Sequence, residues 1–441
     1  MIPTQLQPSA AYLQSLIPLT YTMTNGRTLR YFHSPNVDLL KLDLIYRNGA
    51  AFQPKPLCAG LALDMMLLAS DIHSSSYVAE FFDRRGVIVD RQLSTYSSRL
   101  SITLPAAYAA ETLPLIAHIL YHPHLQQPDF EVLIAKRRQT LSANSHNTSS
   151  MARNLFFSSL FGTDHPEGRY AKPGDEQNIT LNEVARFASS CYLLPYADLV
   201  ASGNLSPQVL RLIDACFGSI SPLRSHPDQV VAPHVHAPQS SRHTLDGAVQ
   251  SSLRLGRLLP LPPDSVQAAE IHMLNTIIGG YFGSRLMSLI RETKGYTYSI
   301  YSLFYFLSSP IPSTSDTQPT PTSVFLIATD VAAQAEQDAI DDIRLLLTDL
   351  SLEPPSEDEL VRVANHMAGD FLRSTDGVLE HAERYWLMLE SGVTEASTAN
   401  LLNLLSSANT ATLGQRLQQL AATYLQPDSL SQTVVGPPLA E

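Results

Sequence analysis

The chain of 441 residues carries little charge and few basic side chains. Only 16% of its residues are charged, and 29 Lys and Arg stand against 41 Asp and Glu, for a formal net charge of −12. A general nucleic-acid binder needs a basic surface that neutralises phosphates, so this composition argues against that class. With 44% hydrophobic residues the sequence is typical of a soluble globular protein, and its length predicts two or three domains.

Long apolar runs and cysteines are also scarce. No apolar run reaches the roughly 18–20 residues that span a bilayer, and residues 1–16 lack a basic stretch followed by an apolar core. We therefore expect no membrane association and a cytoplasmic location. The three cysteines, Cys58, Cys191 and Cys216, are too few and too scattered for a disulfide framework or a four-thiolate zinc site. We expect them to be small buried side chains.

Two halves of similar pattern lie on either side of a stretch rich in Pro, Ser and His. We expect residues 221–244 to be a linker between an N-terminal domain, residues 1–220, and a C-terminal domain, residues 245–441. Each half begins with alternating, strand-like segments and ends in helical patterns. This repeat predicts an α+β fold that consists of two duplicated domains.

The segment from Gly279 to Ser302 holds the most specific arrangement of residues. A corner of small residues precedes a short helix that carries Arg291, and after Gly295 a predicted strand carries Tyr298. The small residues of the corner are Gly279, Gly280, Gly283 and Ser284. A guanidinium can hold a peptide carbonyl or carboxylate, and a phenol can donate a hydrogen bond to an oxyanion. On spacing alone, a solvated cation at a helix end and a tyrosine packed on a sheet remain the alternative.

This segment resembles the C-terminal signature of the insulinase-like (M16) zinc metallopeptidase family, which includes pitrilysin-like enzymes, mitochondrial processing peptidase and small bacterial heterodimeric peptidases. The family pattern is a Gly-rich turn, Ser-Arg-Leu, and an Arg followed seven residues later by a Tyr. It falls on Gly279, Gly280, Ser284, Arg285, Leu286, Arg291, Gly295 and Tyr298. Residues 60–62, 161–170 and 197–203 resemble the family as well, so the likeness spans roughly residues 20–435.

The resemblance implies a fold and a site. Each domain is expected to have a mostly antiparallel sheet of about six strands with helices packed on one face. Arg291 and Tyr298 are expected to contact the substrate and the transition state. Gly279, Gly280 and Ser284 are expected to contact a bound peptide, which can join a sheet as an extra strand because main-chain pairing tolerates many sequences.

The same comparison reveals a departure at the zinc motif. Catalytic members carry His-x-x-Glu-His on the helix after the Gly-Leu-Ala position, where two imidazoles bind zinc and the Glu is the general base. Here a helix expected over residues 60–68 holds Leu63, Met66 and Leu67 at those positions. None of these side chains can ligate zinc or transfer a proton. We therefore expect no metal and no cofactor in this chain.

No other zinc site is evident from the sequence. The third-ligand Glu of the family is replaced by Ser142 or Ala143 on a later helix. His118 and His122 have the i, i+4 spacing of a zinc helix, but Ile119 stands where a zincin motif has Glu. A helix end with one packed and two exposed histidines is the expected structure there.

Three functions remain open. The favoured one is a non-catalytic subunit, inactive alone, that binds peptide and supplies Arg291 and Tyr298 to a catalytic M16 chain carrying His-x-x-Glu-His and the zinc. Retention of the Arg and Tyr beside the loss of every zinc ligand favours it. The alternative is a purely structural or binding protein with no role in proteolysis. An autonomous zinc metalloendopeptidase with unrecognised ligands is the least expected.

Overall fold

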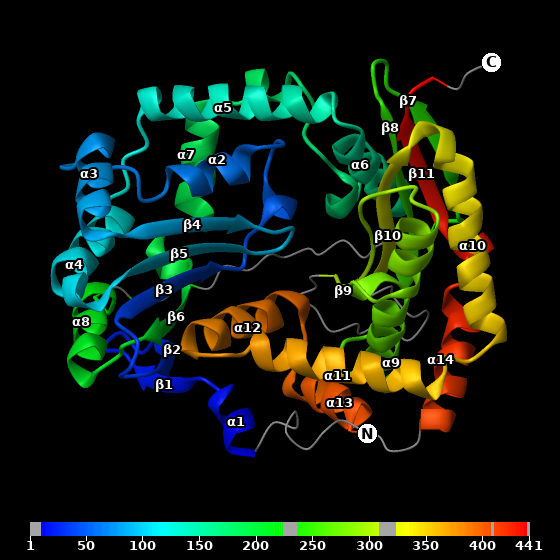
Figure 1. Cartoon of the computed structure of the whole chain (residues 1–441). Coiled ribbons are helices and arrows are strands. Elements are labelled where there is room, and N and C mark those ends of the chain that lie inside the picture. The colour runs from blue at the N-terminus through cyan, green and yellow to red at the C-terminus, as the bar shows by residue number, and fades with distance from the viewer. Residues whose placement is uncertain are drawn as a thin grey trace.

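The computed structural model describes residues 10–219, 221, 223, 236–307, 323–406 and 410–438. Most of the predicted linker and all but the last residue of a Pro/Ser/Thr-rich loop expected at 308–323 lie outside these residues. The described parts form two α+β halves that lie side by side, each built around one sheet (Figure 1).

The first half contains a six-stranded sheet in the order β1-β2-β6-β3-β5-β4. Its strands are β1 (Leu19–Thr22), β2 (Thr28–His33), β3 (Leu39–Tyr46), β4 (Ile88–Leu93), β5 (Ser98–Pro105) and β6 (Asp198–Gly203). Neighbours β2 and β6 run parallel, and the other pairs are antiparallel. Strand β4 is therefore an edge strand that pairs only with β5 among the described residues.

Helices cover one face of this sheet and form its core. The helices of the first half are α1 (Ala10–Ser15), α2 (Cys58–Met65), α3 (Ser75–Arg85), α4 (Ala109–Tyr121), α5 (Gln127–Ser145), α6 (Thr148–Phe161), α7 (Leu181–Cys191) and α8 (Pro207–Phe217). Helix α7 shows why the sequence folds this way locally. Thr180 and Glu183 form a capping box at its start, and Val184, Phe187 and Ala188 recur at helical spacing to face the core.

The second half repeats this strand order with five described strands. They are β7 (Ser240–Thr244), β8 (Gln250–Leu259), β9 (Ile300–Phe306), β10 (Ser323–Ala332) and β11 (Ser431–Gly436), in the order β7-β11-β8-β10-β9. Only β7 and β11 run parallel among them, as β2 and β6 do in the first sheet. The shared order and directions confirm the predicted duplication, and they place β9 at an edge, as β4 is.

The second half has six helices among the described residues. They are α9 (Val266–Asn275), α10 (Glu336–Leu352), α11 (Glu357–Arg373), α12 (Val378–Ser391), α13 (Glu395–Leu405) and α14 (Thr410–Tyr424). Two wider, π-helical segments, η7 (Thr276–Gly280) and η8 (Met287–Thr293), lie between α9 and β9. Such segments are rare and often occur near functional sites.

Each half also lends a helix to the second face of the other half's sheet. Ala382 and Trp386 of α12 form a buried cluster with Phe32, Ile45 and Val200 of the first sheet. In the same way, apolar residues of α6 bury apolar residues of β8 and β10. The family resemblance implied helices on one face of each sheet. The structure adds one helix, α6 or α12, on the second face (Figure 1).

Charged groups join the two halves at the same place. The guanidinium of Arg99 on β5 donates two hydrogen bonds to the Glu383 carboxylate of α12, at 2.7 and 2.8 Å. Lys41 on β3 donates a third at 3.2 Å, and Arg99 lies over the Trp386 ring. Bidentate pairs of this kind are directional as well as strong, so the position of α12 against the first sheet is well specified.

Two strands differ from the sequence prediction. Ser240–Thr244, the end of the predicted linker, forms β7, because it pairs in parallel with β11. Ser431–Gly436 was not predicted to be a strand, yet as β11 it lies in the middle of the sheet between β7 and β8. Both segments are short, and both acquire their structure from distant partners instead of from local pattern.

Candidate functional site

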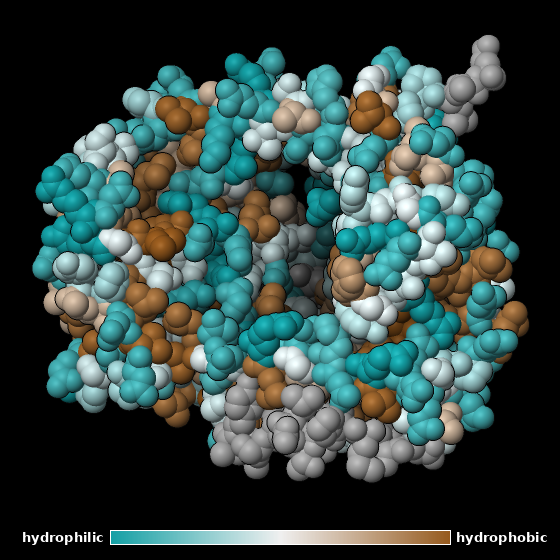
Figure 2. All heavy atoms as spheres, viewed as in Figure 1, coloured by the Kyte–Doolittle hydropathy of each residue, from teal (hydrophilic) through white to brown (hydrophobic). Residues whose placement is uncertain are grey.

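A cavity of about 950 Å³ lies between the two halves. We call it the main cavity. Its walls come from the turn after β4, from α6 and residues 166–170 behind it, from β9, and from the end of α12. The space-filling view shows a deep hollow between the halves (Figure 2). A cavity with apolar walls and a few convergent polar groups is the usual form of a binding site.

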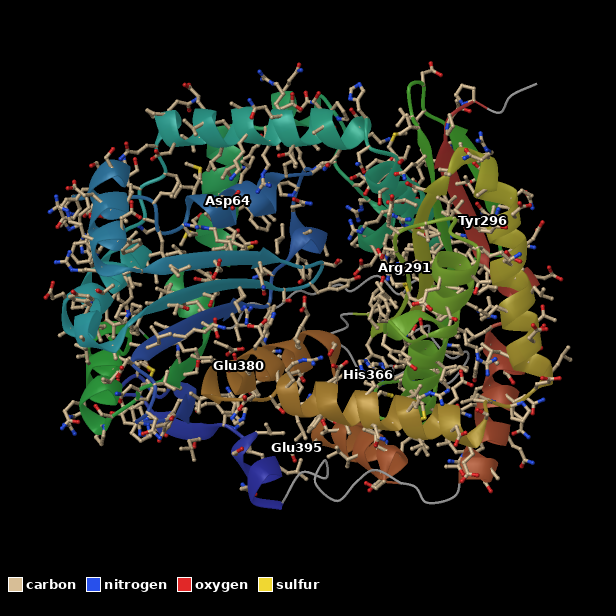
Figure 3. The ribbon with its side chains drawn as sticks, viewed as in Figure 1. Asp64, Arg291, Tyr296, His366, Glu380 and Glu395 are labelled. Atoms are coloured by element: carbon tan, nitrogen blue, oxygen red, sulfur yellow. The ribbon has the colours of Figure 1, made fainter. Side chains whose placement is uncertain are left out.

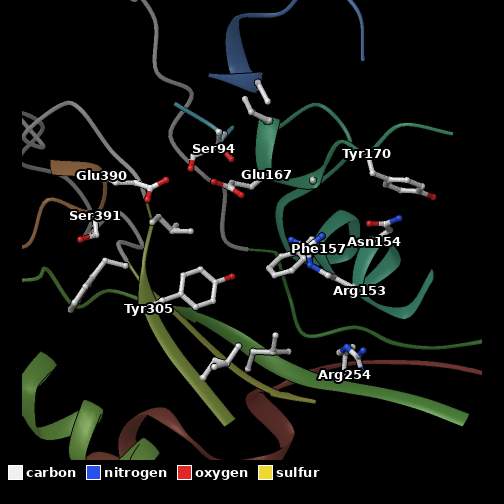
Figure 4. A pocket seen from close by; sticks show the side chains of 18 of the residues that line it. Ser94, Arg153, Asn154, Phe157, Glu167, Tyr170, Arg254, Tyr305, Glu390 and Ser391 are labelled. Atoms are coloured by element: carbon white, nitrogen blue, oxygen red, sulfur yellow. The ribbon is translucent and has the colours of Figure 1, made fainter. Parts of the chain in front are cut away.

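Both charged and aromatic groups project into the main cavity. Glu167, from the first half, and Glu390, from α12, line the same space as Arg153 of α6 and Tyr305 of β9 (Figure 4). Burial raises the pKa of the Glu167 carboxyl, and the negative charge of Glu390 raises it further, while a hydrogen bond from Thr95 and the charge of Arg153 act in the opposite direction. Burial likewise raises the pKa of Tyr305. Polar peptide groups could hydrogen-bond to these side chains.

Local backbone contacts hold the first-half wall of the main cavity. Ser158 of α6 donates a hydrogen bond to the carbonyl of Gly168, which fixes the loop to the helix. A Cβ at Gly168 would lie 2.0 Å from the carbonyl oxygen of Gly162, so only glycine fits there. The sequence places Glu167 beside this close approach, and its carboxylate therefore has a defined position.

The second-half wall is the edge strand β9. Among the described residues β9 pairs only with β10, so its other edge offers unpaired backbone groups. Tyr301 and Leu303 are 42% and 44% exposed and line the main cavity together with Tyr305. An exposed edge of this kind can accept an extended peptide as an additional strand.

The degenerate zinc positions lie away from solvent, in the core of the first half. Leu63, Met66 and Leu67 are 1%, 0% and 2% exposed. Helix α2 ends at Met65, three residues before the predicted end, because Met66 is extended and Leu67 takes a left-handed conformation with φ of 63°. The guanidinium of Arg91 stabilises this early end by donating hydrogen bonds to the Leu63 and Met66 carbonyls, at 3.2 and 2.9 Å.

Basic side chains surround α2 where a zinc site would need acidic or imidazole ligands. Arg137 of α5 forms an ion pair with Asp64 of α2, and Figure 3 shows Asp64 within the first half. Ser142 and Ala143, the positions compared with the family's third ligand, are exposed near the end of α5. The α5 side chain that bonds to α2 is Arg137. Within the described ranges, no group of three or more His, Cys, Asp or Glu could hold a metal ion. The donors at α2 do not fit zinc.

Arg291 and Tyr298 lie on neighbouring segments but in different surroundings. Arg291 on η8 is half-buried, with its guanidinium 4.8 Å from the centre of the Phe282 ring. Gly295, with φ of 67°, ends η8 as predicted. Tyr298 is 90% exposed and borders a hollow of about 340 Å³ that shares Arg254 and Tyr301 with the main cavity.

Tyr298 does not lie on a strand, contrary to the prediction. Strand β9 begins at Ile300, two residues later. The hydroxyl of Thr297 accepts a hydrogen bond from the Ser299 backbone and contacts the carbonyls of Ser299 and Asp330. Such side-chain bonds to the local backbone compete with sheet pairing. In the described part of the chain, no hydrogen bond joins Tyr298 to Arg291.

The three small residues expected to contact substrate have different roles in packing. Gly279 is buried, and a Cβ there would lie 2.6 Å from the backbone nitrogen of Ser302, so this glycine lets η7 approach β9. Ser284 is only 1% exposed. Gly280 is exposed and borders a second cavity beside β9. Of the three, only Gly280 has been placed next to a described cavity.

Sequence reasoning missed most of the residues that line the main cavity. Glu167 lies in the segment 161–170, whose likeness to the family was noted without a role for this carboxylate. Arg153, Tyr305 and Glu390 carry no local signal, because each is brought to the cavity by the packing of α6, β9 and α12. Only the tertiary arrangement identifies them.

Comparison with known proteins agrees with this architecture. Residues 178–367 match the family model described as the peptidase M16 inactive domain. The M16 resemblance is confirmed. An uncharacterized zinc protease, YmxG of Bacillus subtilis, is 21% identical to this chain over 288 residues, which cover 64% of the chain and 69% of the relative. An uncharacterized zinc protease of Streptomyces coelicolor, SCO5738, is 26% identical over 220 residues, or 47% of the chain and 45% of that relative.

Solved structures share the fold over nearly the whole chain. A peptidase M16 inactive domain from Pseudomonas fluorescens has a TM-score of 0.78 at 19% identity, with 96% of this chain and 99% of that chain covered. A protease from Helicobacter pylori has a TM-score of 0.77 at 18% identity, covering 95% and 99%. The periplasmic protease PqqL from Escherichia coli has a TM-score of 0.71 at 14% identity, and 96% of this chain covers 46% of it. Among the described helices, none is both long and apolar enough to cross a membrane.

Proposed function

We propose that this chain is a non-catalytic subunit that binds peptide and contributes Arg291 and Tyr298 to a partner M16 metallopeptidase. The partner carries His-x-x-Glu-His and the zinc. One contrast carries the proposal: the degenerate zinc positions are sealed in the core, whereas Tyr298 is 90% exposed beside the hollow that adjoins the main cavity. An exposed phenol is available to a second chain, and the sealed positions are not.

The roles follow from the chemistry of the side chains. Peptide lies in the main cavity and pairs with the free edge of β9, which recognises main chain and tolerates many sequences. The Tyr298 hydroxyl donates a hydrogen bond to the oxyanion that develops on the scissile carbonyl, and Arg291 holds the substrate backbone. The matching of residues 178–367 to an inactive-domain model and the names of the zinc-protease relatives support this division of labour.

A second candidate function has one observation in its favour. Arg291 stacks on Phe282 and does not line the main cavity, as expected for a purely structural or binding M16-fold protein. In that case Arg291 and Tyr298 have no part in proteolysis. The two candidates differ in the effect of losing the Tyr298 hydroxyl.

The test is a reconstitution with a partner chain. The chain is purified alone and with an M16 chain from the same organism that carries His-x-x-Glu-His, and zinc content and cleavage of an unstructured peptide are measured. Alone, it should hold far less than one zinc and cleave nothing. In the complex, Tyr298→Phe should lower kcat by about 10²–10³-fold, the range for losing one oxyanion donor, while the control Tyr77→Phe, on a half-exposed tyrosine of α3, should not.

Two results decide between the candidates. Equal turnover of the Tyr298→Phe and wild-type complexes assigns Tyr298 a structural role. Chelator-sensitive cleavage by the isolated chain contradicts the non-catalytic reading altogether. A cytoplasmic location is part of the proposal, and cell fractionation tests it, since the structurally similar protease from E. coli is named periplasmic.

A further inference from the structure

A second cavity, of about 540 Å³, lies beside β9. It is bounded by α9, η7, α11 and β9, and we call it the side cavity. Leu303, Phe304 and His272 border both cavities, so the two adjoin at β9. A molecule that pairs with the free edge of this strand has access to both.

The residues of β9 are shared between these spaces. Tyr301 and Tyr305 line the main cavity and Ser302 lines the side cavity, while Leu303 and Phe304 border both. Successive side chains of an added strand point to opposite faces of a sheet. A peptide strand that extends the sheet at β9 therefore directs every second side chain toward the side cavity.

The side cavity is lined by apolar and polar side chains, and one of them has an amide oxygen without a partner among the described residues. Phe304, Met367, Phe371 and Leu401 contribute apolar surface. Asn275, at the end of α9, also lines the cavity and is only 6% exposed, and within the described structure its Oδ1 has no hydrogen-bond partner. A buried polar atom without a partner lowers stability, so a ligand that supplies the missing partner gains binding affinity.

The charged groups at this cavity are already engaged. Asp370 pairs with His366 at 3.1 Å and with Arg373. Arg384 donates a hydrogen bond to Thr398 and lies over the Phe371 ring. A charged occupant would have to displace these partners. A neutral occupant with an apolar body and one polar tip fits without such a loss.

We propose, on the basis of the peptide-binding function proposed above, that the side cavity is a specificity subsite for a tyrosine side chain of the bound peptide. An aromatic ring fills a space walled by Phe304 and Phe371 and removes a large apolar area from water. The phenolic hydroxyl both donates and accepts hydrogen bonds, so it can pair with the Asn275 carboxamide when this side chain turns its buried Oδ1 toward the cavity. Phenylalanine supplies the ring alone, and alanine supplies neither.

The test compares three fluorescent peptides of one unstructured sequence that differ only at a central Tyr, Phe or Ala. Their Kd values for the full chain are measured by fluorescence anisotropy. Tyrosine should bind about 5–10-fold more tightly than phenylalanine, as expected for one hydrogen bond to a buried group, and alanine should bind most weakly. Asn275→Leu should remove the preference for Tyr over Phe while the preference for Phe over Ala remains.

A second variant keeps the test independent of the folding of the first. Met367→Trp fills the side cavity and should weaken binding of the Tyr and Phe peptides toward that of the Ala peptide. Leu345→Trp, on the exposed face of α10, is the matched control and should change nothing. Thermal melts show which variants are folded.

The outcomes separate the subsite from the underlying function. Equal binding of the three peptides, or a Tyr preference that survives both variants in folded protein, overturns the subsite and leaves peptide binding intact. Binding of none of the peptides, by the chain alone and in its complex with the partner, overturns the proposed peptide-binding function and the subsite together.

Discussion

Helices α2 and α9 follow corresponding strands of the two sheets, β3 and β8, but end in opposite ways. Helix α2 stops at Met65, its end is bonded to the Arg91 guanidinium, and the residues beyond it are buried in the core. Helix α9 continues into η7, which ends at Gly280 and borders the side cavity. One corner of the duplicated fold is sealed, and the other is open.

The same corner of the duplicated fold is filled by packed side chains in the first half and borders an open cavity in the second. At α2, three apolar side chains occupy positions that the family resemblance assigns to two zinc ligands and the general base, and burial of each is favourable. At α9, the unpaired Oδ1 of Asn275 and the open side cavity lower stability relative to a packed core. A feature that opposes stability is more informative about function than one that supports it.

Restoring the zinc motif is the strongest challenge to the sealed corner. We expect the triple variant Leu63→His, Met66→Glu, Leu67→His to bind no stoichiometric zinc. It replaces three packed apolar side chains with polar groups in a buried core, and should lower the free energy of unfolding by about 4 kcal/mol or more. Calorimetry and metal analysis of the purified protein measure both effects.

The control places a histidine on the surface of the protein. Leu387→His changes a side chain of α12 that is 53% exposed, and should leave the melting temperature nearly unchanged. One zinc per chain in the triple variant, with a melting temperature close to wild type, would show that the α2 corner is still a competent metal site. The contrast between the two corners would then be wrong.

Two substitutions by phenylalanine, one in each corner, compare the two corners directly. We expect Leu63→Phe to lower the free energy of unfolding by about 1–3 kcal/mol, because extra atoms in a filled core force side chains off their rotamers. Met367→Phe, on a buried residue that borders the side cavity, should cost less than about 1 kcal/mol, since the ring can extend into open space. Urea denaturation midpoints with unchanged slopes measure the difference. Equal costs at both positions would remove the distinction between sealed and open corners.

Much of the fold could be predicted because its helices are strongly patterned. Helix α4, Ala109–Tyr121, is predictable from the sequence alone, since apolar residues recur at helical spacing through it. Strand β11 could not be predicted, because six residues carry too little periodicity and its place depends on β7 and β8. The cross-packing of α6 and α12 was missed for a similar reason. Each helix has a second apolar contact that only the opposite half explains.

The candidate site was less predictable than the fold. The apolar residues Leu63, Met66 and Leu67, which stand where the family motif has His, Glu and His, were legible in the sequence because residue type alone identifies them. The early end of α2 was not, since it depends on Arg91 from the distant strand β4. The side cavity was also hidden. Asn275 gives no signal in the sequence, and its unpaired state arises from the surroundings that α9, η7 and β9 create.

The smallest expected effect concerns Glu167, which contributes an ionisable group to the main cavity from the first half. Burial and Glu390 raise the folded-state pKa of its carboxyl above the ordinary value of 4.5. The folded state therefore holds its proton to higher pH than the unfolded state, so this group lowers stability progressively as pH rises from below 4.5 through the folded-state pKa.

Glu167→Gln should raise the melting temperature at pH 7 by up to about 2 °C, and the gain should vanish below pH 4. Glu395→Gln, on an exposed residue of α13, is the control and should show no such pH dependence. A gain from Glu167→Gln that is equal at both pH values would mean that packing, and not the buried charge, limits stability at this wall of the cavity.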